Sequence, residues 1–219
     1  MAWIPLAVAL CLALHLGAIA LAAMRFGIPI RKIDYGLGPT LLRIGKLRIK
    51  PLPFGGGIQL KHTETEWLEG DAKRDALDVQ PRATRALIAA AGPCALLMLA
   101  LLVFPFDGIG SFGSGFVQYI EGALSPFAHA QQLLRLAQEA ADCQAFLPLL
   151  ALVAAKVAAF NLLPFPGSSG AFLLQILFER SPLGRHWPPQ ATQATLLLFL
   201  GLTLSWLLAL AIYLGPLLV

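Results

Sequence analysis

Two ionisable side chains lie inside long apolar stretches of this sequence. His15 is the only acidic or basic side chain between Met1 and Arg25 apart from the thiol of Cys11, and Lys156 interrupts the apolar run 146–165. An ionisable group inside a membrane span is energetically expensive and marks a functional site by default. A histidine there could bind a metal ion. The alternative for His15 is a neutral ring that bonds a neighbouring helix. The alternative for Lys156 is a bond to a helix carbonyl or an ammonium group that snorkels to water.

A short polar segment, Asn161-Leu-Leu-Pro-Phe-Pro-Gly-Ser-Ser-Gly170, follows the apolar run that contains the lysine. Its two prolines and two glycines prevent a continuous helix. Irregular backbone at membrane depth is tolerated only where it is buried in protein or lines a wet cavity. A lone Pro-x-Pro pair would be interpreted as a kink without chemistry. Here the asparagine, the prolines and the last glycine stand at fixed offsets, so we predict that this segment forms part of a site.

The segment resembles the Asn-x-x-Pro-x-Pro-x-x-Asp-Gly motif of the site-2 protease family, whose members are intramembrane zinc metalloproteases. Asn161, Pro164, Pro166 and Gly170 match the motif. Ser169 stands at the position of the aspartate, which is a zinc ligand in the family. The resemblance therefore implies the family's fold, together with the loss of one metal ligand.

The sequence around His15 resembles the helix of the same family that carries His-Glu-x-x-His. On this resemblance His15 is the first zinc ligand, Leu16 occupies the position of the catalytic glutamate, and Ile19 that of the second histidine. Two histidines at i and i+4 share one helix face and can hold Zn²⁺, while the glutamate serves as base for metal-bound water. A catalytic zinc takes three protein ligands. With one retained ligand position and no base, the resemblance implies an inactive protein without a cofactor, or zinc only if other ligands are used.

The elements that must position these residues are predicted to be membrane helices. The chain of 219 residues is 58% hydrophobic and 13% charged, whereas a soluble domain has about 25% charged residues. Apolar runs of about 20 residues indicate four spans, near 2–24, 86–106, 146–165 and 191–219. We predict one all-α polytopic membrane domain over 1–219, with a small cytoplasmic β-sheet inserted between the first and second spans.

The predicted sheet occupies about residues 28–62. Leu47, Ile49 and Leu52 alternate there with basic residues, which is typical of a half-exposed sheet. Pro51–Gly57 resembles a Pro-Leu-Gly-Gly segment of the family, whose sheet lies beside the active-site entrance and can offer an edge strand to an extended peptide. An ordinary surface sheet is the alternative interpretation.

The basic residues predict the orientation in the membrane. Twelve of the 16 Lys and Arg residues lie between Arg25 and Arg85, and two more, Arg180 and Arg185, precede the last span. By the positive-inside rule these loops are cytoplasmic and both termini are non-cytoplasmic, in what we expect to be a bacterial inner membrane. The outer segment 107–142 is too short for the PDZ domain that many relatives carry. No basic stripe interleaved with aromatic residues suggests binding to nucleic acid.

The sequence therefore predicts a catalytically inactive relative of these proteases that binds or holds a membrane protein or transmembrane segment within the lipid bilayer. One alternative is an active metalloprotease with substituted ligands, and another is a packing subunit of a membrane complex. On the first interpretation the Lys156 cation could occupy part of the volume left by the metal.

Overall fold

Three long apolar helices dominate the computed structural model, which describes residues 3–66, 69–181 and 189–215. They are α1 (Trp3–Arg25), α3 (Arg82–Val103) and α9 (Pro189–Leu214). Each contains 22 or more residues of high mean hydropathy and is long enough to cross a membrane. These helices confirm three of the four predicted spans, with boundaries shifted by a few residues.

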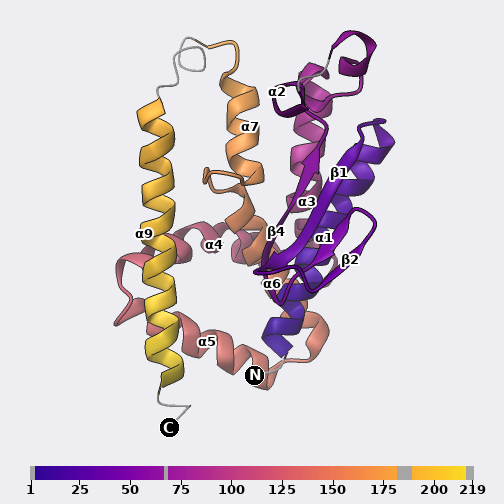
Figure 1. Ribbon diagram of the computed structural model, residues 1–219. Helices are drawn as coiled ribbons and strands as arrows, with labels where there is room; N and C mark the ends of the chain where they lie inside the picture. The colour runs from indigo at the N-terminus through magenta and orange to yellow at the C-terminus, as the bar shows by residue number, and fades with distance from the viewer. Residues whose placement is uncertain (1–2, 67–68, 182–188, 216–219) are drawn as a thin grey trace.

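The third predicted span, 146–165, is not confirmed as one continuous helix. Helix α6 (Phe146–Leu162) has 17 residues, about 25 Å at 1.5 Å per residue, whereas a bilayer core is about 30 Å thick. The backbone leaves the helix at Leu163, next to the first proline of the broken segment. Helix α7 (Ser169–Phe178) follows the break and runs on toward the end of the molecule where α3 begins (Figure 1).

Helices α1, α3 and α6 form the centre of the bundle. Cys11, Leu96, Ala154 and Ala158 make one fully buried cluster between them. Small side chains allow helix backbones to approach closely, which is how helices associate in a membrane without a hydrophobic driving force. His15, one helical turn after Cys11 on α1, therefore lies next to a tightly packed cluster.

Two helices occupy the segment between the second and third predicted spans. The sequence predicts only a helical piece near 130–141, but the structure has α4 (Asp107–Leu124) as well as α5 (His129–Cys143). The glycines in α4 permit contact between helices and make no turn. A Cβ on Gly115 would be 2.8 Å from the Cβ of Ala159, and one on Gly122 would be 2.3 Å from the Trp206 ring. Helix α4 therefore joins α6 to α9 (Figure 1).

The predicted β region, which lies between α1 and α3 in the sequence, forms one four-stranded sheet. Its strands are β1 (Ile30–Leu37), β2 (Leu42–Ile44), β3 (Leu47–Ile49) and β4 (Leu52–Leu60). The order across the sheet is β2-β3-β1-β4. Strands β1 and β3 are parallel, and the other neighbours are antiparallel. Within the described part of the chain, one side of β2 consequently has no neighbouring strand.

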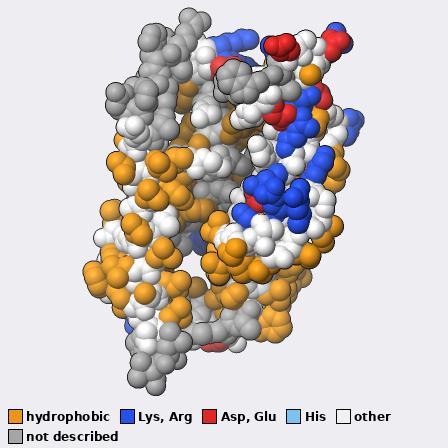
Figure 2. All heavy atoms as spheres, viewed as in Figure 1, with side chains coloured by type: hydrophobic (Ala, Val, Ile, Leu, Met, Phe, Trp, Pro, Cys, Tyr) orange, Lys and Arg blue, Asp and Glu red, His pale blue; other side chains and the backbone are white. Residues whose placement is uncertain are grey.

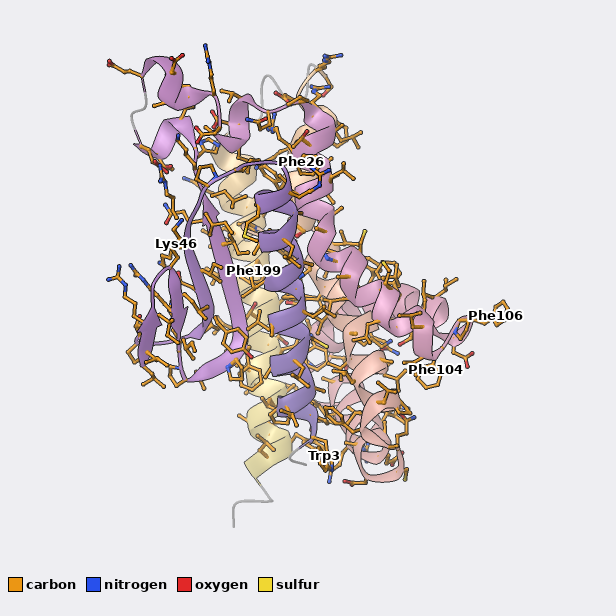
Figure 3. All side chains as sticks on the ribbon, turned by 90° about the vertical axis from the view of Figure 1, so that its right-hand side faces the viewer. Trp3, Phe26, Lys46, Phe104, Phe106 and Phe199 are labelled. Carbon is orange, nitrogen blue, oxygen red and sulfur yellow. The ribbon has the colours of Figure 1, made fainter. Side chains whose placement is uncertain are left out.

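The sheet lies alongside α1 (Figures 1 and 3). The Tyr35 hydroxyl donates to the Ala9 carbonyl at 2.8 Å. Ala9 precedes Arg25 by sixteen helical residues, or about 24 Å along the axis. Because β4 has a glycine at the contact with Leu16, where a Cβ on Gly56 would be 3.1 Å from the Leu16 side chain, the strand can approach the helix closely.

A charged connection links the sheet to α3. It contains α2 (Thr63–Glu66) and two short 3₁₀ turns, η1 (Gly70–Lys73) and η2 (Leu77–Val79). Arg31 of β1 forms a two-pronged pair with Glu66, and the Lys61 ammonium donates to Asp75. These pairs fasten the connection to the end of the sheet that lies near the start of α3.

Candidate functional site

His15 lies on the buried face of α1, against α3. The residue is 7% exposed, and no described residue gives its Nδ1 a well-formed hydrogen bond, although the Gly92 backbone lies beside the ring. A Cβ on Gly92 would be 2.4 Å from that Nδ1 and 2.5 Å from Cε1. The missing side chain at Gly92 is therefore what makes room for the ring. The histidine packs on a neighbouring helix, as the alternative to metal binding predicts, but without the hydrogen bond at Nδ1 that a purely structural role would favour.

The two positions that the resemblance assigns to the base and the second ligand are occupied by packed hydrocarbon. Leu16 is 4% exposed, and its side chain meets β4 at Gly56. Ile19 packs against an apolar cluster that includes Ile88 of α3, and Phe172 of α7 packs against the same cluster. Neither side chain can accept a proton or coordinate a metal.

The broken segment is held mainly by its own hydrogen bonds. The Ser168 hydroxyl donates to the Leu163 carbonyl at 2.6 Å and accepts from the Ala171 amide at 3.0 Å, so it caps α7. A Cβ on Gly170 would be only 2.1 Å from the Leu162 carbonyl oxygen. The glycine that matches the family motif is therefore required sterically, because the start of α7 presses against the end of α6.

The other residues of the motif point in different directions. The Asn161 amide donates to the Val157 carbonyl of its own helix at 2.9 Å. Pro164 and Pro166 are exposed, and Ser169 is half-buried in the first turn of α7. Phe172 of α7, one turn after Ser169, packs on the same apolar cluster as Ile19 of α1, while α7 itself lies mainly against α3. The broken segment and the α1 position of the second ligand thus share one region of the molecule.

Lys156 lies on the side of α6 that faces α4. Its ammonium group donates to the Ser114 hydroxyl at 2.7 Å. Ala154, two residues earlier and so about 200° around the helix, packs in the cluster with Cys11 of α1. The contact with Ser114 favours a lysine that is satisfied by a neighbouring helix over a cation placed beside His15.

A zinc site does not fit the side chains that surround His15. Within residues 3–66, 69–181 and 189–215, no three His, Cys, Asp or Glu side chains gather closely enough to hold a metal ion. A catalytic zinc needs three protein ligands, and the helical neighbours of His15 at the relevant positions are Leu16 and Ile19. We therefore derive no metal-dependent step for this site.

Two contacts at the site were not predicted. Gly92 stands inside α3 directly before Pro93, and a glycine within a helical pattern is a recognisable signal of close packing. Tyr35 reaches Ala9 from the sheet, and no local sequence signal links those two residues. The first contact could have been found from the sequence, whereas the second required the fold.

A cavity of about 350 Å³ lies between α1 and the sheet, and Leu16 forms part of its wall. Its lining is almost wholly apolar and consists of four α1 residues and four strand residues: Ala13, Leu16, Gly17, Ala20, Ile33, Tyr35, Leu47 and Ile49. Leu16, which stands at the position of the family's catalytic glutamate, therefore contributes to the apolar lining of this cavity.

Comparison with known families supports the resemblance found in the sequence. Peptidase family M50 matches residues 3–208. Because this match covers nearly the whole chain, the protein belongs to the site-2 protease family. Family membership and the apolar helices together identify an integral membrane protein. No curated protein matches the chain.

Proposed function

We propose that this protein is a catalytically inactive member of family M50 that binds and holds a membrane protein partner, in a bacterial inner membrane. The observation that carries the proposal is the packing of Leu16 and Ile19. Both are apolar: Leu16 is buried against β4 at Gly56, and Ile19 packs on the apolar cluster that contains Ile88 of α3. With packed hydrocarbon at these two positions the fold has neither the base nor the second metal ligand, which supports a binding role in place of peptide hydrolysis.

The free edge of β2 is the surface we assign to the partner. Leu42 and Ile44 of this strand are 51% and 60% exposed, and the strand order gives β2 a neighbour on one side only. An unpaired edge can accept an extended peptide through backbone hydrogen bonds. A segment of a membrane protein that unwinds near the bilayer surface would supply such a peptide.

The unpartnered Nδ1 of His15 favours one competing function, an active metallopeptidase with substituted ligands. A buried nitrogen without a hydrogen bond can accept a metal. Metal analysis of the purified full-length protein separates the two functions. We expect zinc far below one ion per chain, unchanged in His15→Ala. Stoichiometric zinc that His15→Ala removes would overturn the proposal in favour of the enzyme.

Rebuilding the ligand set tests the assignment of positions. The triple variant Leu16→Glu, Ile19→His, Ser169→Asp should bind zinc together with His15 and gain zinc-dependent thermal stability, because a metal that binds only the folded state stabilises it. Each change alone should destabilise by roughly 2–3 kcal/mol, the cost of an unpaired polar or charged group within the dry part of the membrane domain. The matched control is the double variant Leu16→Glu, Ser169→Asp, which lacks one ligand. If a folded triple variant binds no more zinc than this control, the assigned positions do not converge.

Site-specific photo-crosslinking tests the binding role. A photoreactive amino acid at Leu42 should give a discrete protein adduct in cells, and a proline at Arg43, which removes an edge amide, should abolish it. The control position is Leu102 of α3, which is 79% exposed on another surface. If Leu42 and Leu102 give the same adducts, the protein is a packing subunit without a dedicated edge.

A further inference from the structure

The sheet has two chemically different faces at its free edge. Cross-strand partners lie on the same face of a sheet. Arg43 of β2 stands opposite Arg48 of β3, which is in register with Asp34 of β1. Leu42 and Ile44, the neighbours of Arg43 on β2, point to the other face, which is the one beside α1. A strand added at this edge would therefore meet cations on one face and hydrocarbon on the other.

The face that carries Arg43 has an excess of positive charge. Its one carboxylate, Asp34, pairs with Lys32 at 2.5 Å and with Lys50 at 3.4 Å. It also stands in register beside Arg48, and no other acidic residue occurs within 30–60. Arg43 lies one strand further away, and no ion pair in the described part of the chain includes it. The edge strand therefore carries the cation of this face that has the least compensation.

The excess charge lies at the surface. Arg43 is exposed, and Figure 2 shows Lys and Arg side chains gathered over the sheet, with hydrophobic side chains beside and below them. Lys46, in the turn between β2 and β3, points away from α1 (Figure 3). Like charges directly opposite each other, as in the pair of Arg43 and Arg48, destabilise a sheet. A carboxylate beside Arg43 on a further strand would offset that repulsion.

The other face of the edge strand is apolar. Leu42 and Ile44 are exposed, while their cross-strand partners Ile49 and Leu47 line the cavity beside α1. Side chains of an added strand alternate between the two faces. If one residue lies beside Arg43, the residues before and after it consequently lie beside Leu42 and Ile44. Since β2 has three residues, three consecutive residues of a partner define the contact.

We propose that the partner adds to the β2 edge an extended segment in which an acidic residue stands opposite Arg43 and is flanked on both sides by apolar residues. Opposite charges on cross-strand neighbours stabilise a sheet, and the flanking residues bury hydrocarbon with Leu42 and Ile44. This specificity rests on the proposed pairing of the partner with the β2 edge. The headgroup of an anionic lipid is the other anion that a membrane offers to Arg43, and the test distinguishes the two.

The test measures binding of synthetic peptides to the full-length protein in nanodiscs of phosphatidylcholine, which has no net charge. The first peptide is Ser-Thr-Val-Glu-Val-Thr-Ser, and two others carry Gln or Lys in place of Glu. Each has a benzophenone at one end, so that bound peptide is captured and located by mass spectrometry. Adducts should map to β2 and its flanks. The Glu peptide should bind about fivefold more tightly than the Gln peptide, and the Lys peptide more weakly than either.

The order of the residues is tested with a peptide of the same composition. In Ser-Thr-Glu-Val-Val-Thr-Ser the acidic residue has an apolar neighbour on one side only. When its Glu stands opposite Arg43, one of the positions beside Leu42 and Ile44 receives a threonine. This peptide should bind more weakly than the one with Val-Glu-Val, whereas a purely electrostatic contact would bind both alike.

A charge swap at Arg43 tests the assigned pair. In Arg43→Gln the Glu and Gln peptides should bind equally. In Arg43→Glu the preference should reverse in favour of the Lys peptide, and the variant should remain folded because Arg48 then faces an opposite charge. The charge-matched control is Arg135→Gln, which removes an exposed arginine of α5 and should keep the preference for Glu.

Three outcomes would overturn the proposal, and they differ in what they imply for the proposed function. Equal binding of the Glu and Gln peptides, with adducts at β2, would keep the pairing at the edge but remove the specificity for an acidic residue. Absence of β2 adducts with every peptide would refute the pairing itself. If phosphatidylglycerol in the nanodisc abolishes the preference for the Glu peptide, Arg43 binds lipid headgroups instead.

Discussion

Gly92 sets the distance between α3 and the ring of His15. An alanine there would place a methyl group 2.4 Å from Nδ1, so the ring or the helix must move. We expect Gly92→Ala to lower the free energy of unfolding by about 1–3 kcal/mol, the usual effect of overpacking. Thermal unfolding in detergent measures the change.

A double-mutant cycle identifies the cause of that loss. If the ring is what the methyl group meets, Gly92→Ala should be much less harmful in a His15→Ala background. Gly201→Ala is the control, because nothing lies within 4 Å of its Cβ, and it should leave stability equal or slightly higher. Equal losses at Gly92 in both backgrounds would show that the ring is not the obstacle.

Individual residues of the site could be predicted as far as their chemistry depends on type and spacing. The resemblance identifies Leu16 and Ile19 as unsuited to their zinc-site positions, because an aliphatic side chain has no lone pair to donate. It leaves Ser169 as at best a weak, neutral oxygen ligand. The sequence leaves Lys156 with two interpretations, since the direction of a side chain depends on the rotation of its helix within the bundle. Only the packing of α6 on α4 gives it Ser114 as a partner.

At the scale of elements, the ion pairs that fasten the connection between β4 and α3 should make it sensitive to acid. The hydrogen bond from Lys61 lowers the pKa of Asp75, and the hydrogen bond from Arg31 lowers the pKa of Glu66. A carboxyl whose pKa is lower in the folded state stabilises that state above its unfolded pKa, which is about 4. The stabilisation is lost as the pH falls through the lower, folded pKa.

We therefore expect faster amide exchange in residues 61–80 at about pH 3 than at pH 7, after correction for the intrinsic pH dependence of exchange. Exchange in α6 should change little, because its described residues contain no carboxyl group. Lys61→Met should remove much of the pH effect. Parallel loosening of α6 would instead indicate global acid unfolding.

The elements show where sequence patterns are ambiguous. Long apolar runs predicted α1, α3 and α9, since no soluble alternative buries so much hydrocarbon. The glycine-rich start of α4 was not predicted as a helix, because glycine signals both a turn and a close helix contact. Only the neighbours of Gly115 and Gly122 decide between these. The break after α6 was predicted, but not that it leaves a helix of 17 residues.

At the scale of the whole molecule, the start of α1 and the end of α9 lie at the end opposite α2 (Figure 1). Three candidate spans and one broken crossing through α6 and α7 would return the chain to its starting side. Tags at either terminus should therefore report the non-cytoplasmic side, and a tag at Lys73 the cytoplasm, because Lys and Arg residues are concentrated around it. A cytoplasmic C-terminus would contradict this topology.

The arrangement of the elements relative to one another could not be predicted from hydropathy and charge patterns in the sequence. The position of the sheet beside α1 depends on contacts between residues such as Tyr35 and Ala9, which lie 26 positions apart. Alternation of apolar and basic residues predicts a sheet with two unlike faces, but not the depth at which it stands. The sequence therefore indicated the family and most elements, while their mutual arrangement required the three-dimensional structure.

The depth of that sheet has a consequence for the bilayer itself. Its cationic face stands level with the middle of α1, where an undisturbed membrane would offer only acyl chains. In a bilayer that α1 and α9 span, we expect headgroups and water to descend to Arg43 and Arg48, so the hydrophobic thickness should be smaller on the sheet side than along α9, whose exposed leucines match a full span. The hydrophobic height of the protein should therefore be smaller on the sheet side than on the α9 side, and this hydrophobic mismatch should draw it toward thinner regions of the membrane.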